Sequence, residues 1–322
     1  MTKIQRLVAG LLSVGACILS TYISASVRHM HDKWFAEGVS ALPVDSIPIC
    51  ERMFCPPLTG GRRVLFGIKS PATPEGAKRR QIIRDTFVRQ ILEYSPAIAN
   101  YTFYTADMAS ENGEEKDLTV LKELHGETRD IATHIKTLAF FRALLRQSQE
   151  DGQNNKLYEW VCHIDDDSYL QIYRLMRNYL LAPEYHPFRT VIGRMRVEPA
   201  TNGDASFLYP GGQMYCVSWD IMRNFARYFE QVMPECRNHS EMGGWPADDL
   251  LVGLFLHRTG GGYRFVDWPN ALAYDLGPDW NLHAYAHAAN PKLGINPHKM
   301  KSNKQYQQVA DAYENIFLAR DF

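Results

Sequence analysis

The sequence has no excess of charge of either sign, because 35 Lys and Arg residues balance 36 Asp and Glu residues and leave a formal net charge of −1. Proteins that bind nucleic acid need a basic surface, so this balance argues against a nucleic-acid partner. The six cysteines fit no zinc-ligand spacing, which argues against a zinc module. With 45% hydrophobic residues, the 322-residue chain can bury a sizeable core, so disorder over most of its length is not expected.

Charged side chains are also absent from residues 7–27. At about 1.5 Å per residue a helix of this length spans the roughly 30 Å of a bilayer core, which predicts a transmembrane signal-anchor. Lys3 and Arg6 precede it and favour a cytoplasmic tail over residues 1–6. The alternative is a cleaved signal peptide, with residues 7–19 as its apolar region and small residues near 23–25 as its cleavage site. Both interpretations place the remainder of the chain in the secretory pathway.

Residues 28–61 have no hydrophobic periodicity and are rich in proline and glycine, which predicts an extended stem before a globular domain over residues 62–322. Disulfides form in the secretory pathway. We expect Cys50 and Cys55 to form a local bridge, and Cys162 to be buried and unreactive in a strand.

Three consecutive acids, Asp165, Asp166 and Asp167, directly follow an apolar run whose β-branched and aromatic residues predict a strand buried on both faces. Open α/β sheets bind ligands at the carboxyl ends of their strands. Alternate residues of an extended segment share a side, so Asp165 and Asp167 are expected to point together and Asp166 away. Two such groups suit Mg²⁺ or Mn²⁺, although an ordinary acidic turn has the same sequence.

The rest of the chain alternates between predicted strands and helices. Strands are predicted near residues 64–68, 101–104, 190–193 and 263–266, and helices over residues 76–94, 118–124, 133–149 and 305–317. This alternation predicts an α/β fold with a mostly parallel sheet flanked by helices. Gly211 and Gly212 precede another apolar strand, and Asp248 and Asp249 begin a helix where acids favour the helix dipole whether or not they are catalytic. The basic residues at 78–84 are expected to form a solvated helix face.

The order of these pieces resembles the metal-dependent β1,3-glycosyltransferases of the secretory pathway, the galactosyl- and N-acetylglucosaminyltransferases. The matching segments are VLFGIKS at 64–70, RRQIIRDTF at 79–87, THIKT at 133–137, DDDSY at 165–169 and DDLLVG at 248–253, with a weaker likeness in PHKMKS at 297–302. Phe87 stands where that family usually has Trp, and Asp248 stands where it usually has Glu. The resemblance covers roughly residues 62–317.

The resemblance implies a GT-A type fold, with a Rossmann-like mixed sheet, and an inverting transfer from a UDP-sugar to a hydroxyl of a glycan acceptor on a glycoprotein or glycolipid, forming a β1,3 linkage. It implies Mn²⁺ or another divalent cation as cofactor and a single-pass type II protein of the Golgi membrane. The implied metal ligands are Asp165, Asp167 and His298. Asp249 is the implied general base, with Asp248 in reserve. The residues expected around the nucleotide and its phosphates are Lys69, Ser70, Arg80, Arg84, Lys136, Asp165 and Asp166.

Two other functions stay open on the sequence alone. The first is a catalytically silent, lectin-like or scaffolding protein of the same fold, although such a protein has no need for both the Asp165/Asp167 pair and Asp249. The second is a metal-dependent phosphohydrolase, because acidic clusters at strand ends also serve that chemistry. Neither the sugar transferred nor the acceptor follows from the sequence.

Overall fold

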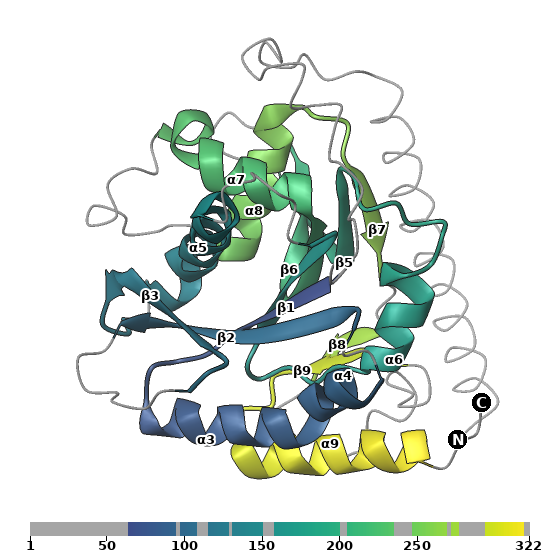
Figure 1. Cartoon of the computed structure of the whole chain (residues 1–322). Coiled ribbons are helices and arrows are strands. Elements are labelled where there is room, and N and C mark those ends of the chain that lie inside the picture. Colours follow the sequence, from purple (N-terminus) through teal and green to yellow (C-terminus); the bar gives the residue numbers. More distant parts are fainter. Residues whose placement is uncertain are drawn as a thin grey trace, which may run out of the picture. The chain divides into compact units, whose positions relative to one another are not determined.

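The described part of the chain is built around a seven-stranded sheet (Figure 1). The structure, a computed structural model, describes residues 64–94, 97–107, 115–128, 131–150, 158–199, 205–234, 247–268, 272–276 and 294–318. In spatial order the strands are β3 (Leu118–His125), β2 (Ala99–Asp107), β1 (Val64–Lys69), β4 (Trp160–Asp165), β6 (Phe207–Ser218), β5 (Thr190–Glu198) and β7 (Arg264–Asp267). Strand β6 is antiparallel to both neighbours, and all other neighbouring pairs are parallel. The predicted mixed, mostly parallel α/β sheet is confirmed.

The predicted cytoplasmic tail (1–6), membrane anchor (7–27) and stem (28–61) lie outside the described residues, as do Cys50 and Cys55. Within the described ranges, no helix combines the length and the apolar character needed to cross a bilayer.

Helices cover both faces of the sheet (Figure 1). One face packs against α5 (Lys136–Glu150), α7 (Trp219–Val232) and α8 (Asp248–Thr259). The other packs against α3 (Pro74–Ile83), α4 (Arg89–Tyr94), α6 (Ile172–Leu175) and α9 (Asn303–Leu318). Along β1, Phe66 and Ile68 point into the core beneath α3, α4, α6 and α9, and Leu65 points into the core beneath α5, α7 and α8. This alternation is the two-residue period of a strand. Both faces of this strand are therefore buried, which accounts for its continuous apolar sequence.

Short-range signals define several element ends. Helix α3 begins after Thr73, whose hydroxyl accepts a hydrogen bond from the Gly76 amide at 3.0 Å, and Pro74 occupies the first turn, where its missing N–H costs nothing. Helix α8 ends at Gly260, whose φ of 57° is the left-handed conformation that glycine adopts most readily. Strands β8 (Ala273–Asp275) and β9 (Asn296–His298) form a separate parallel pair that brings the C-terminal part of the chain to the end of β4.

One predicted element is wrong. The helix expected over residues 118–124 is β3, which pairs with β2 in parallel at an edge of the sheet. Leu121 and Leu124 are its buried residues, and their spacing of three is typical of a helix face. The pairing shifts register between Ala106 and Asp107, which removes the strict alternation that identifies a strand.

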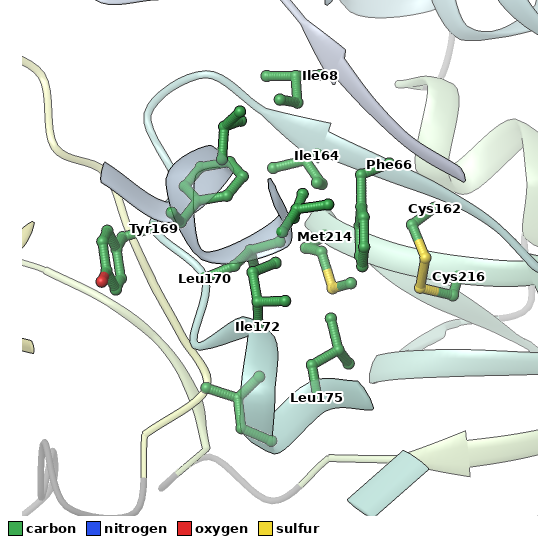
Figure 2. Close-up of a cluster of buried hydrophobic side chains, with 14 of the residues drawn as sticks. Phe66, Ile68, Cys162, Ile164, Tyr169, Leu170, Ile172, Leu175, Met214 and Cys216 are labelled. Atoms are coloured by element: carbon green, nitrogen blue, oxygen red, sulfur yellow. A yellow bond between two sulfur atoms is a disulfide. The ribbon is translucent and has the colours of Figure 1, made fainter. Parts of the chain in front are cut away.

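The prediction for Cys162 also needs correction. The residue is buried in β4, as expected, but it forms a disulfide with Cys216, its direct partner on the antiparallel strand β6 (Figure 2). The bridge lies beside Phe66 and Met214 in the core and joins the strand that ends at Asp165 to the strand that carries Gly211 and Gly212. Those two glycines lie within β6 rather than before it.

Candidate metal and sugar-transfer site

The structure brings Asp165, Asp167 and His298 together at the carboxyl end of β4. Each offers a ligand atom, and the three atoms lie within 4.8 Å of one another. His298 Nε2 is 3.0 Å from Asp167 Oδ1 and 3.8 Å from Asp165 Oδ2. Two carboxylates and an imidazole are a donor set that suits Mn²⁺ and related divalent cations.

The imidazole of His298 is also held by a carboxylate outside this cluster, that of Asp275. Its Nδ1 lies 2.7 Å from Asp275 Oδ1, so Nε2 is the nitrogen directed at Asp165 and Asp167. A carboxylate on the second ring nitrogen fixes the orientation of a metal-binding histidine and raises its basicity. Sequence reasoning missed Asp275, because only the pairing of β8 with β9 brings it opposite His298.

The cluster attracts positive charge. Burial works against the charged imidazole, but the neighbouring carboxylates outweigh it and raise the pKa of His298 to about 10. Burial likewise opposes ionisation of Asp165, yet Lys69, His163 and His298 hold its pKa well below the usual value. Lys301 contributes a further ammonium group to Asp167. Asp165 and Asp167 supply two negatively charged carboxylates and His298 supplies an imidazole nitrogen, and these ligand atoms lie close together. The cluster therefore fits a divalent cation.

The three acids are arranged by a turn. Strand β4 ends at Asp165, whose carbonyl accepts a hydrogen bond from the Ser168 amide at 3.0 Å. Asp165 and Asp167 meet at His298 as predicted, but the tight turn rather than an extended backbone brings them together. Asp166 lies apart from this ligand set, and burial together with the charge of Asp167 raises its pKa to about 7.

The C-terminal segment holds this turn in place. The Tyr169 amide donates to the Pro297 carbonyl at 3.0 Å, and the Met300 amide donates to the Asp167 carbonyl at 3.1 Å. Arg79, a buried residue of the basic cluster, donates to the carbonyls of Asp166 and Met300. The arrangement of Asp165, Asp167 and His298 therefore depends on a segment more than 120 residues beyond β4 in the chain.

Lys69, at the end of β1, links this cluster to the start of α8. Its ammonium lies 2.8 Å from Asp165 Oδ1 and 3.2 Å from Asp248 Oδ2. Asp248 is buried, and it also accepts hydrogen bonds from the Thr137 hydroxyl and from the Asp249 amide. Asp248 thus ties the start of α8 to Lys69 and to α5, and its role as reserve base stays a prediction.

Asp249 follows at the first turn of α8. Its Oδ2 accepts the Gly212 amide and its Oδ1 accepts the Leu250 amide, each at 2.8 Å. A β-carbon on Gly212 would stand 3.1 Å from Asp249 Oδ2, so only glycine lets the carboxylate come this close to β6 without a shift. Burial, with a smaller effect of Asp248, raises the pKa of Asp249. A carboxylate held rigidly, with raised basicity and further lone pairs, can accept a proton.

The arginines expected around phosphate have acidic partners within the protein. Arg80 is fully buried, and its guanidinium donates to Glu115 at 2.8 and 3.1 Å and to the Ser70 hydroxyl at 3.1 Å. Arg84 binds Glu115 and forms two hydrogen bonds of 2.8 Å with Asp117. The expectation of a solvated basic face is therefore wrong for these side chains, and their contact with nucleotide phosphates stays a prediction.

Lys136, the remaining predicted phosphate contact, is buried at the start of α5. Its ammonium donates to the Ser70 carbonyl at 3.0 Å and binds Glu127. Burial lowers its pKa. Lys136 and Ser70 thus join the ends of β1 and α5 close to Lys69, and a direct contact with the nucleotide stays a prediction for both.

Sequence reasoning missed Lys301 and His163. Lys301 lies three residues after His298, and this spacing within one basic segment is the signal that could have identified it. His163 is buried in β4, with Nδ1 2.6 Å from the Tyr104 hydroxyl and Nε2 3.0 Å from the Gly212 carbonyl, so it fixes the residue that holds Asp249. A histidine inside a strand carries no local signal for such a contact.

Comparison with known proteins bears on this arrangement. A glycosyltransferase involved in the glycosylation of the major capsid of PBCV-1 aligns with 12% identity over 77% of this chain and 99% of its own, at a TM-score of 0.37. An active-site mutant of LgtC aligns with 10% identity over 79% of this chain and 95% of its own, at a TM-score of 0.41. Comparison with curated protein sequences gives no match. The profile of the Fringe-like family matches residues 64–259, which is more than half of the chain. The chain therefore belongs to the Fringe-like family, and it is a glycosyltransferase of the GT-A type.

Proposed function

We propose that this protein transfers a hexose or N-acetylhexosamine from a UDP-sugar to a hydroxyl of a glycan acceptor, with inversion and with formation of a β1,3 linkage. The observation that carries the proposal is the cluster of Asp165, Asp167 and His298 next to the rigidly held carboxylate of Asp249. Membership of the Fringe-like family supports the same reaction class.

Asp165, Asp167 and His298 would hold Mn²⁺ or a related divalent cation, which neutralises charge that builds on the departing diphosphate. In the single displacement the acceptor oxygen forms a bond to C1 of the donor sugar, and the bond from C1 to the diphosphate oxygen breaks. UDP leaves with that electron pair. The hydroxyl proton passes to Asp249, whose raised pKa suits it to accept a proton at neutral pH.

Lys69 keeps the two halves of this site together, because its ammonium contacts both Asp165 and Asp248. Asp248 in turn accepts the amide of Asp249, so the position of the base follows the end of β1. Lys301, whose side chain is 73% exposed, is available to contact a phosphate once a cation engages Asp167.

We propose that the protein is located in the secretory pathway, as a single-pass type II protein of the Golgi membrane. The buried Cys162–Cys216 disulfide supports it, since such bridges form and persist in oxidising compartments.

The test combines transfer and binding assays. Asp249→Asn should lower kcat by at least about a hundredfold while leaving Mn²⁺-dependent UDP binding intact, because it removes the proton acceptor and not the metal ligands. Asp167→Ala should abolish that binding. Asp311→Asn, an exposed acid on α9, makes the same change of charge as Asp249→Asn and serves as control.

Near-normal kcat in Asp249→Asn would remove the residue from the role of base. The assay also separates the other functions. A phosphohydrolase would use water to break the diphosphate bond of the UDP-sugar without an acceptor, giving UMP and a sugar 1-phosphate, and a catalytically silent protein would bind UDP without turnover.

A further inference from the structure

Two arginines on β5 have no partner among the residues that the structure describes. Arg194 and Arg196 are half-buried, and no hydrogen bond, ion pair or ring contact joins either side chain to this part of the chain. Glu198, the acid nearest along the strand, forms no ion pair with them. Every other arginine in the described ranges has at least one such contact. Each guanidinium carries donors that the described residues leave unused, so the two side chains are available to bind an external anion.

Strand β6 connects these arginines to the proposed base. It pairs with β5, where Arg196 lies opposite Tyr209, and it packs against α8, which carries Asp249 (Figure 1). A β-carbon on Gly211 would stand 3.3 Å from the Arg196 Nε and 3.8 Å from its Cζ, so the guanidinium extends past this glycine. The next residue, Gly212, holds Asp249.

The order of the strands separates these arginines from the metal ligands. Asp165 ends β4, Gly212 lies on β6 and Arg196 lies on β5, so the metal cluster, the base and the arginines follow one another across the sheet. Two strand spacings separate β4 from β5, or roughly 10 Å. In a single displacement the acceptor approaches from the side of the base, opposite to the departing diphosphate. Groups beyond the base are therefore on the acceptor side.

We propose that Arg194 and Arg196 bind an anionic group on the acceptor sugar, and that the acceptors of this enzyme are acidic glycans. The anion is a uronic-acid carboxylate or a sulfate ester, both of which match the forked donor geometry of guanidinium. The proposal rests on the proposed transfer reaction, because that reaction defines which side of Asp249 the acceptor occupies. It names the substrate class that the family and the metal site leave open.

Binding of small glycosides to the full chain in the presence of Mn²⁺ and UDP tests the inference without turnover. The probes are p-nitrophenyl β-glucuronide, p-nitrophenyl β-glucoside and its 6-sulfate, which differ only at C6. Their affinities can be measured by saturation-transfer NMR. We expect the glucuronide, the sulfate or both to bind at least about tenfold more tightly than the glucoside, as a charge-assisted hydrogen bond predicts. The stronger of the two anionic probes identifies the anion.

The variants locate this preference. Arg194→Gln and Arg196→Gln should each reduce the preference for anionic probes over the glucoside, and the double variant should abolish it. Arg196→Lys should retain part of this preference because the charge remains. Lys122→Gln is the matched control, since it removes one positive charge from the exposed surface of β3, five strand spacings or roughly 24 Å from β5. Glucoside binding, UDP binding and the melting temperature should stay unchanged in the arginine variants.

Equal affinity for the three probes, or absence of binding by all of them, would overturn the proposal. So would a loss of UDP affinity in Arg194→Gln or Arg196→Gln, which would assign the arginines to the donor. An acidic peptide without sugar that competes as well as the glucuronide would contradict a glycan ligand. This test can be separated from a failure of the proposed transfer reaction. The preference for anionic probes is measured by binding, so it can be observed, and lost in the arginine variants, even in a protein that transfers no sugar.

Discussion

The disulfide between Cys162 and Cys216 gives the most quantitative prediction. It joins strands of the central sheet that are 54 residues apart in sequence, and both cysteines are fully buried. Closing a loop of that length removes unfolded-state entropy worth about 4 kcal/mol at 25 °C. For a domain of this size, each kcal/mol shifts the melting temperature by about 2–4 °C, so the double variant Cys162→Ala/Cys216→Ala should melt about 8–16 °C lower.

Differential scanning calorimetry and circular dichroism on the full chain measure this shift. The two single variants are the internal control, because either substitution already breaks the same bridge. Cys162→Ala and Cys216→Ala should therefore each melt close to the double variant, and the cycle should be strongly non-additive.

Two results would contradict this reasoning. A double variant that melts within about 2 °C of the wild type would mean that the bridge does not constrain the unfolded chain. Additive single effects would mean that each cysteine contributes through packing alone, since independent sites add and a shared bond does not.

Three further predictions concern other parts of the structure. Burial and Asp248 raise the pKa of Asp249, so the acidic limb of the pH profile of kcat/KM should lie above the ordinary carboxyl range and disappear in Asp249→Asn, as initial rates between pH 4 and 8 would reveal. Gly253→Ala would bring a β-carbon within 2.2 Å of the Tyr209 β-carbon, so chemical denaturation should show a loss of about 1–3 kcal/mol, whereas an unchanged midpoint would reject this packing. Burial acts to raise the pKa of Asp117, but its hydrogen bonds, first that from Arg84, lower the pKa overall. The contribution of Asp117 to folding stability is therefore complete above the ordinary carboxyl pKa and is lost as the pH falls through the lowered value. In Asp117→Asn the acid-induced fall in melting temperature should be shallower than in the wild type.

The parts of the fold that sequence reasoning predicted correctly depend on local patterns. Strand β1, the strand ending at Asp165 and the helix beginning at Asp248 are continuous apolar or capped segments, and their neighbours in sequence carry the information. Strand β3 was predicted wrongly because it is an edge strand with an irregular register. Its identity depends on pairing with β2, which no local pattern encodes.

The site divides in the same way. The acids at 165–167 and 248–249 could be identified from the sequence because they follow or begin elements with clear signals. His298 was named only through the family resemblance of residues 297–302. The partners of these residues could not be identified from the sequence. The pairing of Arg80 with Glu115 joins segments 35 residues apart, and the contact of Asp275 with His298 depends on a strand pair formed late in the chain.

By itself the sequence determined the alternation of strands and helices, the order of the motifs and the residues able to bind a cation or take a proton. Only the tertiary structure decided which of those residues meet: Asp165 with Lys69 and His298, Asp249 with Gly212, and Cys162 with Cys216. Local propensity acts over a few residues. These contacts join residues that are far apart in the sequence, from 37 residues between Gly212 and Asp249 to 133 residues between Asp165 and His298. Such contacts form only when the whole sheet and its covering helices pack together.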